Sequence, residues 1–409
     1  MKGITMHMPR QLAAVLCGLT MSIGSALAQS APPETMRAEV GKPLQAAQDL
    51  LRAGKPREAL SRVAEAEAVG NLSGHERMVI ERMRAGAALG AGDDATAARS
   101  FEAVLASGKL GAAETLPVLE SMAGLAYRRK DYPQAIALAE RYLKEGGRSD
   151  KMRELKTSAH YLSGDYAGVV RDTQQRVQAM EQATPVVDEP TLRLLAASYG
   201  KLDDQAGYVA TLEKLLVYHP KQAYWSDRLA RLQGAAGFPD RLRLDVYRLR
   251  RATDTLEDTE QYVEMAQLAL QAGLPTEALR VVEAGYAAGK LGSGPEASRH
   301  QRLRELATRQ AAEDEKALQV EEVGRQGDAL VNTGHALVSA GRLDKGIALL
   351  EHGLTKGGLK RPDEARLHLG QAYLQSGNKA RAIDSFRAVR GADEAVELAR
   401  LWEIHARKP

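Results

Sequence analysis

A regular internal period constrains this chain of 409 residues more than any other feature of its sequence. A turn followed by the residue that opens a second helix recurs along it, at Ala59, Ala97, Ala135, Val169, Tyr208, Leu242, Ala278, Gly346 and Ala382. The successive intervals are 38, 38, 34, 39, 34, 36, 68 and 36 residues, and 68 is twice 34, so one repeat is missing or disguised. Helix pairs that bury their apolar faces only against neighbouring pairs produce such a period, whereas globular enzyme folds do not. The period therefore predicts an all-α solenoid.

The turns ahead of these residues share one chemistry. Most contain a glycine, as in Gly92-Asp93-Asp94 and Gly164-Asp165-Tyr166, and several place Pro or Asp next. Glycine can adopt the positive φ that closes a first helix, and Pro or Asp can start the second. A second short motif recurs where some second helices end, as in Gly289-Lys290-Leu291. It lacks the glycine spacing and the Ser or Thr of a phosphate-binding loop, so it predicts glycine C-caps.

The residues that open the second helices are mostly small, which fits a position where two helices approach closely. Val169, Tyr208 and Leu242 are larger, and there we expect a wider helix crossing or a shift of one or two residues. Aromatic residues gather in these less regular repeats, at Tyr199, Tyr208, Tyr218, Tyr224, Trp225, Phe238, Tyr247 and Tyr262. Two interpretations stay open: a binding patch, or large rings that fill the space between helices, and the second is favoured.

The best-formed repeat runs from Arg361 to Val389. Leu369-Gly370 and Tyr373 fall on one helical face, Gly377-Asn378 breaks the helix, and a second apolar face follows at Ala382, Phe386 and Val389. These residues resemble the tetratricopeptide repeat family, whose unit of ~34 residues carries Leu-Gly, Tyr, Gly-Asp/Asn, Ala, Phe and Ala at these offsets. The resemblance extends over nearly all of the chain after its first segment. It implies a right-handed α-solenoid of about nine helix pairs.

The first segment, residues 1–28, has the pattern of a secretory signal peptide. Lys2 and Arg10 supply the positive start, an apolar stretch follows, and Ala26-Leu27-Ala28 provides a small-x-small cleavage site before Gln29. An uncleaved anchor and a lipoprotein attached through Cys17 are the alternatives. The apolar stretch is shorter than the ~20 residues that span a bilayer. The sequence therefore predicts export to the bacterial periplasm with cleavage after Ala28.

The rest of the chain divides by composition and period into four parts. Residues 29–43 read as a flexible, proline-bearing lead-in, and residues 44–295 as an N-terminal block of repeats. Residues 296–326 are rich in charge, with no Gly or Pro before Gly324, and predict one long helix that replaces the missing pair. Residues 327–409 form a C-terminal block. The long helix can serve as a stiff spacer or as a hinge, and the sequence leaves both possibilities open.

Composition excludes several classes of function. Aromatic residues make up only 4% of the chain, which favours thin helical layers over a deep core. Without residues 1–28 the chain carries 54 basic and 53 acidic residues, a balance that is not typical of proteins that bind nucleic acid or membrane surfaces. The single cysteine, Cys17, lies in the segment that we expect to be removed, so the mature chain has no thiol nucleophile or Cys metal ligand.

No catalytic constellation stands out, and the sequence predicts no enzyme, no cofactor and no metal. The histidines are scattered, although His335, His352 and His368 could approach one another in the last two repeats. A metal or acid/base cluster is one interpretation of these three, and ordinary, partly exposed histidines are the favoured one. Carboxylates alternate with Lys and Arg at helix-surface spacings, as on a solvated face.

The family resemblance implies a binding surface on the inner side of the array, lined by first helices that meet an extended peptide or a partner helix. Carried onto this chain by register, that face includes Arg82, Glu120, Tyr127, Arg128, Glu154, Tyr161, Arg193, Gln267, His335 and Gln371. Its mixed charge lacks the basic clamp that some family members use for an acidic C-terminus. The leading hypothesis is a periplasmic scaffold for a protein partner in an envelope assembly. The alternatives are an enzyme or accessory subunit of cell-wall or polysaccharide metabolism, and a structural homo-oligomer.

Overall fold

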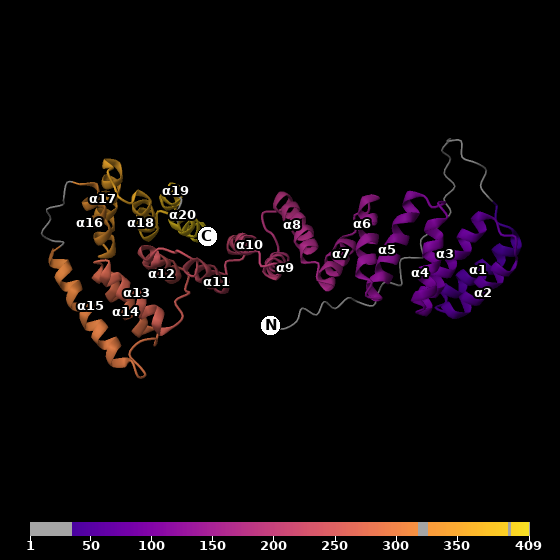
Figure 1. Cartoon of the computed structure of the whole chain (residues 1–409), viewed down its shortest axis with the longest axis horizontal. Helices are drawn as coiled ribbons and strands as arrows, with labels where there is room; N and C mark the ends of the chain where they lie inside the picture. Colours follow the sequence, from indigo (N-terminus) through magenta and orange to yellow (C-terminus); the bar gives the residue numbers. More distant parts are fainter. Residues whose placement is uncertain (1–34, 318–325, 392–393, 409) are drawn as a thin grey trace. The chain divides into compact units, whose positions relative to one another are not determined.

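The computed structural model describes residues 35–317, 326–391 and 394–408, and all regular structure there is helical. The chain forms two compact units, residues 1–175 and 176–409. Unit 1 contains α1 (Ala38–Arg52), α2 (Pro56–Ala68), α3 (Gly74–Ala91), α4 (Asp94–Ala106), α5 (Ala112–Arg128), α6 (Tyr132–Lys144), α7 (Asp150–Ser163) and the start of α8 (Tyr166–Ala183). Within this unit the helices follow one another in pairs (Figure 1).

Unit 2 contains the rest of α8 and the remaining helices. They are α9 (Glu189–Lys201), α10 (Gln205–Tyr218), α11 (Gln222–Gln233), the short 3₁₀ turn η2 (Asp240–Leu242), α12 (Arg243–Ala252), α13 (Thr259–Gln271), α14 (Pro275–Ala287), α15 (Ala297–Ala317), α16 (Gly327–Ser339), α17 (Leu343–Lys356), α18 (Pro362–Gln375), α19 (Lys379–Arg387) and α20 (Glu394–Ala406). Among the described residues nine helix pairs are present, from α1–α2 to α18–α19, while α15 and α20 have no pair of their own. The predicted α-solenoid is confirmed.

The residues predicted to open the second helices form the contacts between helices. Ala59, Ala97, Ala135, Ala278 and Ala382 are all fully buried, because each faces the first helix of its own pair at close range. The expected shift is found at Leu242, one of the three larger residues. Leu242 does not open an α-helix; it is buried in η2, just ahead of α12, so the prediction is displaced by one residue.

The aromatic residues of the irregular repeats mostly serve packing. Trp225, Tyr199 and Tyr247 are buried in the hydrophobic core of unit 2, and the other five are half-buried. Gly207 leaves room for the Tyr199 ring, since a Cβ there would lie only 2.3 Å from a ring carbon. The space-filling interpretation therefore describes these rings.

The turns between first and second helices adopt the predicted backbone. Gly54, Gly92, Gly164, Gly273 and Gly377 all have φ between 71° and 81°. Two turns reach the same conformation without glycine, at Lys130 (φ 62°) and Asp203 (φ 56°). A side chain in this left-handed region costs roughly 1–2 kcal/mol, so these two turns carry strain that the others lack.

Replacing Lys130 by glycine is therefore expected to stabilise unit 1. The gain should be about 0.5–1 kcal/mol, because relief of the strained φ outweighs the added freedom of the unfolded chain. Urea unfolding followed by circular dichroism measures the change. The neighbouring Arg129 has a helical φ of −74°, so Arg129→Gly serves as the matched control and should destabilise. Equal effects of the two substitutions would contradict the strain argument.

The long helix that interrupts the array is confirmed over Ala297–Ala317, while residues 318–325 lie outside the described part of the chain. Adding 34 to Ala278 gives position 312, where a second helix would open, but α15 runs straight through it. The helix packs against α14 through a buried strip of His300, Leu303, Ala307 and Ala311. It therefore takes the place of a first helix whose own second helix is missing.

The start of the array differs from the prediction. The helix α1 begins at Ala38, ahead of the proline at which we expected the lead-in to end, and Pro43 lies inside it. Val40, Leu44 and Ala47 form one buried stripe that spans the proline, so burial of this face outweighs the lost hydrogen bond. The predicted signal peptide, residues 1–28, lies outside the described residues. None of the described helices has the length and apolar character that a membrane crossing requires.

Unit 2 closes on itself, which the repeat period did not predict. The C-terminal helices α18 and α20 return to lie beside α11 and α12 (Figure 1). One hydrophobic cluster joins Trp225, Leu229 and Val246 to Leu367 and Trp402. Ion pairs cross the same contact, Arg241 with Glu364 at 2.8 Å and Arg400 with Glu213 at 2.7 Å. Helices more than 120 residues apart in sequence thus share one core.

Candidate protein-interaction surface

Six of the ten residues predicted for the binding face lie in unit 1, on the first helices of three successive repeats. They are Arg82 on α3, Glu120, Tyr127 and Arg128 on α5, and Glu154 and Tyr161 on α7. We call these six residues the first-helix face of unit 1. Arg128, Glu154 and Tyr161 are exposed, and the other three are half-buried. The register places them on neighbouring helices, since α5 also contacts α7 directly.

Two tyrosine pairs mark this face. Tyr127 meets Tyr132 edge to face, with ring centroids 5.9 Å apart, and Tyr161 meets Tyr166 in the same way at 5.7 Å. The pairs are related by one repeat, since 161 − 127 = 34 and 166 − 132 = 34. Each pair bridges the turn between a first and a second helix. The Tyr-x₄-Tyr spacing was visible in the sequence, and it could have identified Tyr132 and Tyr166, which the prediction omitted.

Hydrogen bonding ties Tyr127 to the next repeat. Its hydroxyl pairs with the side chain of Ser158 on α7, and burial raises the pKa of Tyr127 above its ordinary value. The phenol therefore stays neutral and can both donate and accept hydrogen bonds. Beside it, Gly124 on α5 leaves open space, because a Cβ added there meets no atom within 4 Å.

The most exposed apolar side chains of this face lie at the end of α7. Tyr161 is 39% exposed and Leu162 is 52% exposed, and both are too apolar to be favoured in water. Leu162 was not among the predicted residues. Tyrosine beside an aliphatic side chain is well suited to a partner's apolar group, since the rings offer large contact area with few torsions to freeze.

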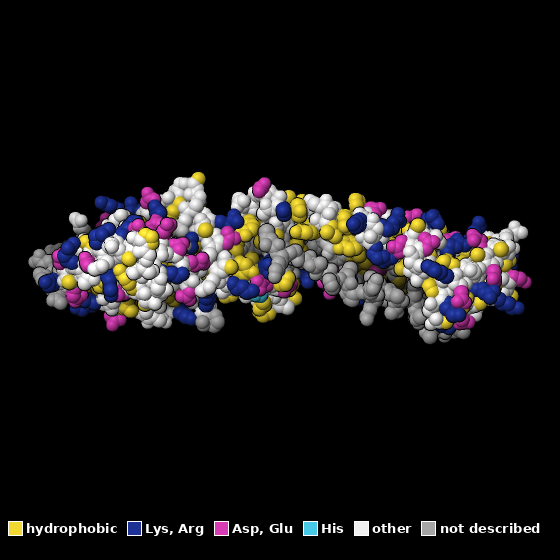
Figure 2. Space-filling view, turned by 90° about the horizontal axis from the view of Figure 1, so that it is seen from below, with side chains coloured by type: hydrophobic (Ala, Val, Ile, Leu, Met, Phe, Trp, Pro, Cys, Tyr) yellow, Lys and Arg dark blue, Asp and Glu magenta, His cyan; other side chains and the backbone are white. Residues whose placement is uncertain are grey.

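The charges around this face are of both signs and mostly paired. Arg82 bonds Glu114 at 2.7 Å, and Arg128 bonds Asp94 at 2.9 Å. Figure 2 shows Lys and Arg side chains interspersed with Asp and Glu over the visible surface, with no block of one sign. Because Arg82 and Arg128 are already paired, they favour a partner recognised by apolar contacts over one recognised by net charge.

The other four predicted residues lie in unit 2, where they differ in accessibility. Arg193 on α9 is exposed, and Gln267 on α13 is half-buried. Gln371 on α18 is only 4% exposed, and His335 on α16 is partly buried. Gln371 bonds Asp245 of α12, and His335 stacks on His368, which also contacts Asp245, so α12 occupies the face of the C-terminal repeats that register assigned to a partner.

A buried polar network holds this contact. Asp245 of α12 is 3% exposed and accepts hydrogen bonds from Gln371 at 3.1 Å and from Arg248 at 2.7 Å. His368 Nε2 lies 3.1 Å from the same carboxylate, and the ring of His368 stacks on that of His335 with centroids 4.0 Å apart. Arg248 also bonds Glu277 of α14 at 2.7 Å. Every charge in the network has an opposite partner.

The approach of three histidines is thus only partly realised. His335 and His368 stack, but His352 is exposed on α17 and does not join them. Within the described residues no group of three or more His, Cys, Asp or Glu side chains is arranged to hold a metal ion. The stacked pair faces Asp245 and Arg248, so it belongs to the contact with α12.

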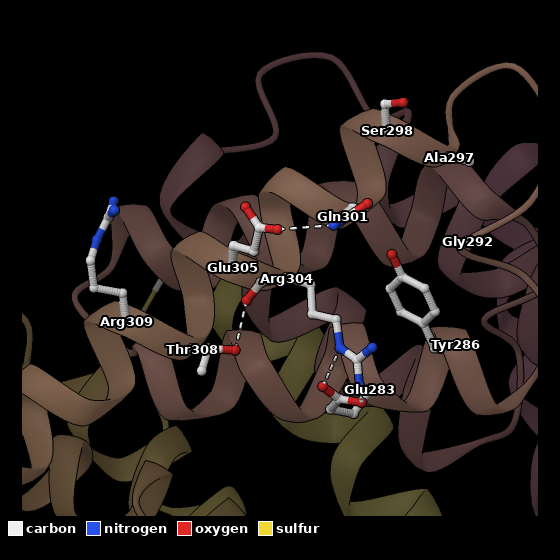
Figure 3. A pocket seen from close by; sticks show the side chains of 10 residues that line it. All are labelled: Glu283, Tyr286, Gly292, Ala297, Ser298, Gln301, Arg304, Glu305, Thr308 and Arg309. Atoms are coloured by element: carbon white, nitrogen blue, oxygen red, sulfur yellow. Dashed lines mark hydrogen bonds and ion pairs between the residues drawn. The ribbon is translucent and has the colours of Figure 1, made fainter.

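One hollow of about 860 Å³ lies between α14 and α15. Its walls come from Glu283, Tyr286, Gly292, Ala297, Ser298, Gln301, Arg304, Glu305, Thr308 and Arg309. Figure 3 shows that its two carboxylates are already bonded: Glu283 to Arg304 at 2.7 Å, and Glu305 to Gln301 at 3.0 Å. The Arg304 guanidinium also covers the Tyr286 ring at 4.8 Å. The hollow therefore offers no pair of facing carboxylates for acid/base catalysis.

Comparisons with known proteins agree with the helical repeat. Residues 331–396 match the tetratricopeptide repeat family. No curated protein matches the chain. Among solved structures, the chain is similar to a tetratricopeptide repeat protein from Parabacteroides merdae, with 13% identity, 80% of this chain and 99% of the other covered, and a TM-score of 0.27.

Two further solved structures are similar to this chain. The tetratricopeptide repeat domain of P58(IPK) shares 17% identity, with 90% of this chain and 98% of the other covered and a TM-score of 0.25. The TPR2AB domain of yeast Sti1, in complex with pHSP90, shares 14% identity, with 71% and 98% covered and a TM-score of 0.22. At TM-scores below 0.5, none of these likenesses bears on what this chain binds.

Proposed function

We propose that this tetratricopeptide repeat protein, recognised by the family match over residues 331–396 and by its helix pairs, is a non-enzymatic scaffold of the bacterial periplasm. It binds an extended segment or partner domain of an envelope protein on the first-helix face of unit 1. Proteins of this repeat class bind other proteins, and the chain follows that pattern. The periplasmic setting is supported by the signal-like residues 1–28.

One observation carries the choice of surface. Tyr161 and Leu162 place adjacent, exposed apolar side chains on α7, beside tyrosine pairs that repeat every 34 residues. The corresponding face of the C-terminal repeats is occupied by α12, as the contacts of Gln371 and His368 with Asp245 show. Of the two blocks of first helices, the one in unit 1 therefore has its apolar side chains available for a partner.

Photocrosslinking in cells tests this proposal. A photoreactive amino acid placed at Tyr161 of the full chain is expected to capture one discrete envelope protein, because this residue lies on the proposed face. The same group at Glu102, an exposed residue of α4, is the matched control and should not capture it. Equal capture at both positions would contradict the assignment of the face, and capture of a second copy of the chain would support the homo-oligomer instead.

Binding of the captured partner should depend on Tyr161. Tyr161→Ala is expected to weaken it by about 2 kcal/mol or more, as for aromatic residues that dominate other interfaces. Glu102→Ala should change it by less than about 0.5 kcal/mol. Titration calorimetry with the partner measures both values.

Mass spectrometry of the same purified chain tests export. The expected first residue is Gln29, and an intact Met1 or a chain found in the cytoplasm would contradict the periplasmic setting.

A further inference from the structure

The contact between α12 and the C-terminal repeats contains two stacked imidazoles, and we call this contact the closure seam, defined by Asp245, Arg248, His335, His368 and Gln371. The seam joins α12 to α18, because Asp245 contacts both His368 and Gln371. These two residues lie 123 and 126 positions after Asp245 in the sequence. The seam lies between helix pairs and not within one, since α12 pairs with α11 and α18 pairs with α19. Separation of α12 from α18 would therefore leave every helix pair intact. Opening would break the bonds of the seam together with the hydrophobic cluster and the ion pairs that cross the same contact, while the helices themselves would stay formed.

Charge limits how many protons the closed seam can hold. His368 faces the Asp245 carboxylate at 3.1 Å, so an imidazolium there has an opposite charge beside it. His335 stacks on His368 at 4.0 Å, and in the described part of the chain the Asp245 carboxylate bonds His368 and not His335. Two imidazolium rings at that separation repel each other. The closed seam therefore disfavours protonation of both rings at once.

Among the remaining groups around His335, His368 and Arg248 also oppose its protonation, whereas the Asp245 carboxylate favours it. The charged and titratable groups that face it or its stacked partner are His368 and Glu364 on α18, Asp245 and Arg248 on α12, Arg241 on η2, and Glu277 and Arg280 on α14. The two glutamates are each paired with an arginine, Glu364 with Arg241 and Glu277 with Arg248. Burial lowers the pKa of His335 well below its ordinary value, and the charges of His368 and Arg248 lower it further.

We propose that the closure seam is an acid-opened latch, in which protonation of His335 separates α16, α18 and α20 from α12 and uncovers the first-helix face of the C-terminal repeats. In the closed state His335 is neutral. In the open state it meets water and takes up a proton at its ordinary value of about 6.5.

The direction of the effect follows from proton counting. Below about pH 6.5 the open state binds one more proton than the closed state, so a fall in pH favours opening. Above that value His335 is neutral in both states, and closure has its full stability. The ratio of open to closed molecules should rise by about tenfold between pH 7.5 and pH 5.5.

The two tryptophans of the chain report on this opening. Trp225 of α11 and Trp402 of α20 are both buried where α20 meets α11, and the Trp225 ring lies 6.2 Å from that of His405. Acrylamide quenching of tryptophan fluorescence in the full chain therefore measures their exposure. Burial lowers the pKa of His405 to about 4, so its own titration falls below the window from pH 7.5 to 5.5.

The expected result is a rise in quenching between pH 7.5 and pH 5.5 that follows the tenfold rise in the ratio of open to closed molecules, with the helical signal in circular dichroism retained. His335→Phe keeps a ring in the stack without a titrating group, and His335→Gln removes the ring; both should abolish the rise. His352→Gln, at the exposed histidine of α17, is the matched control and should preserve it. No rise in the natural chain would overturn the latch. An unchanged rise in both His335 variants, or loss of helical signal in step with quenching, would also overturn it.

Discussion

Replacing Gly346 by alanine is expected to destabilise unit 2 by about 2–3 kcal/mol, although the change adds one methyl group. A Cβ at this position would lie 2.7 Å from the carbonyl oxygen of Gly334 and 2.8 Å from the backbone nitrogen of Val338. Those are backbone atoms of α16, which cannot move aside as a flexible side chain can. Gly327 and Gly353 make the same close approach one heptad away along α16 and α17. The added methyl group of Gly346→Ala must therefore force α16 and α17 apart along their shared length.

The matched control for this substitution is Gly124→Ala. Gly124 lies inside α5, and a Cβ there meets no atom within 4 Å. Alanine favours a helix over glycine by about 0.8–1 kcal/mol, so this variant should be more stable than the natural chain. Urea unfolding followed by circular dichroism gives both values. A loss of stability of the same size in both variants would show that close helix approach does not decide the effect.

The second large effect is expected for Asp245→Asn, which should lower the stability of unit 2 by about 3–5 kcal/mol. The asparagine keeps the shape but removes the charge that faces Arg248 and His368 inside the closure seam. Burial alone would raise the pKa of Asp245, but the charges of His368 and Arg248 outweigh burial and hold the pKa below its ordinary value. The carboxylate therefore stabilises the fold at neutral pH, and this contribution is lost only in strong acid.

Asp49→Asn is the matched control for the charge. Asp49 pairs with Arg52 on α1 at 3.5 Å, with both side chains more than half exposed. An exposed pair of this kind contributes about 0–1 kcal/mol, so the variant should unfold almost as the natural chain does. Thermal or urea unfolding at pH 7 compares the two. Similar losses in both variants would mean that Asp245 acts as a surface charge and not as the centre of the seam.

Parts of the candidate site could be predicted because they follow from local register. The register of the family resemblance predicts Tyr127, Arg128 and Tyr161 on first helices, and they lie on α5 and α7. Their edge-to-face partners, Tyr132 and Tyr166, carried the same period and were missed because the prediction considered first helices alone. The exposure of Leu162 had no such signal, since a leucine at a helix end is as often buried.

The helix pairs and their turns were determined by the sequence alone, because the interactions that form them join residues less than 40 positions apart. Gly164 and Gly377 close helices by their own backbone freedom, and Ala135 permits close approach wherever its pair lies. The closure of unit 2 was decided only by the tertiary structure. Asp245 resembles any surface charge between Leu244 and Val246 until α18 brings His368 and Gln371 to it from 123 and 126 residues away. Contacts between residues so far apart in sequence produce no repeat period, because the apolar pattern of α12 does not depend on that of α18.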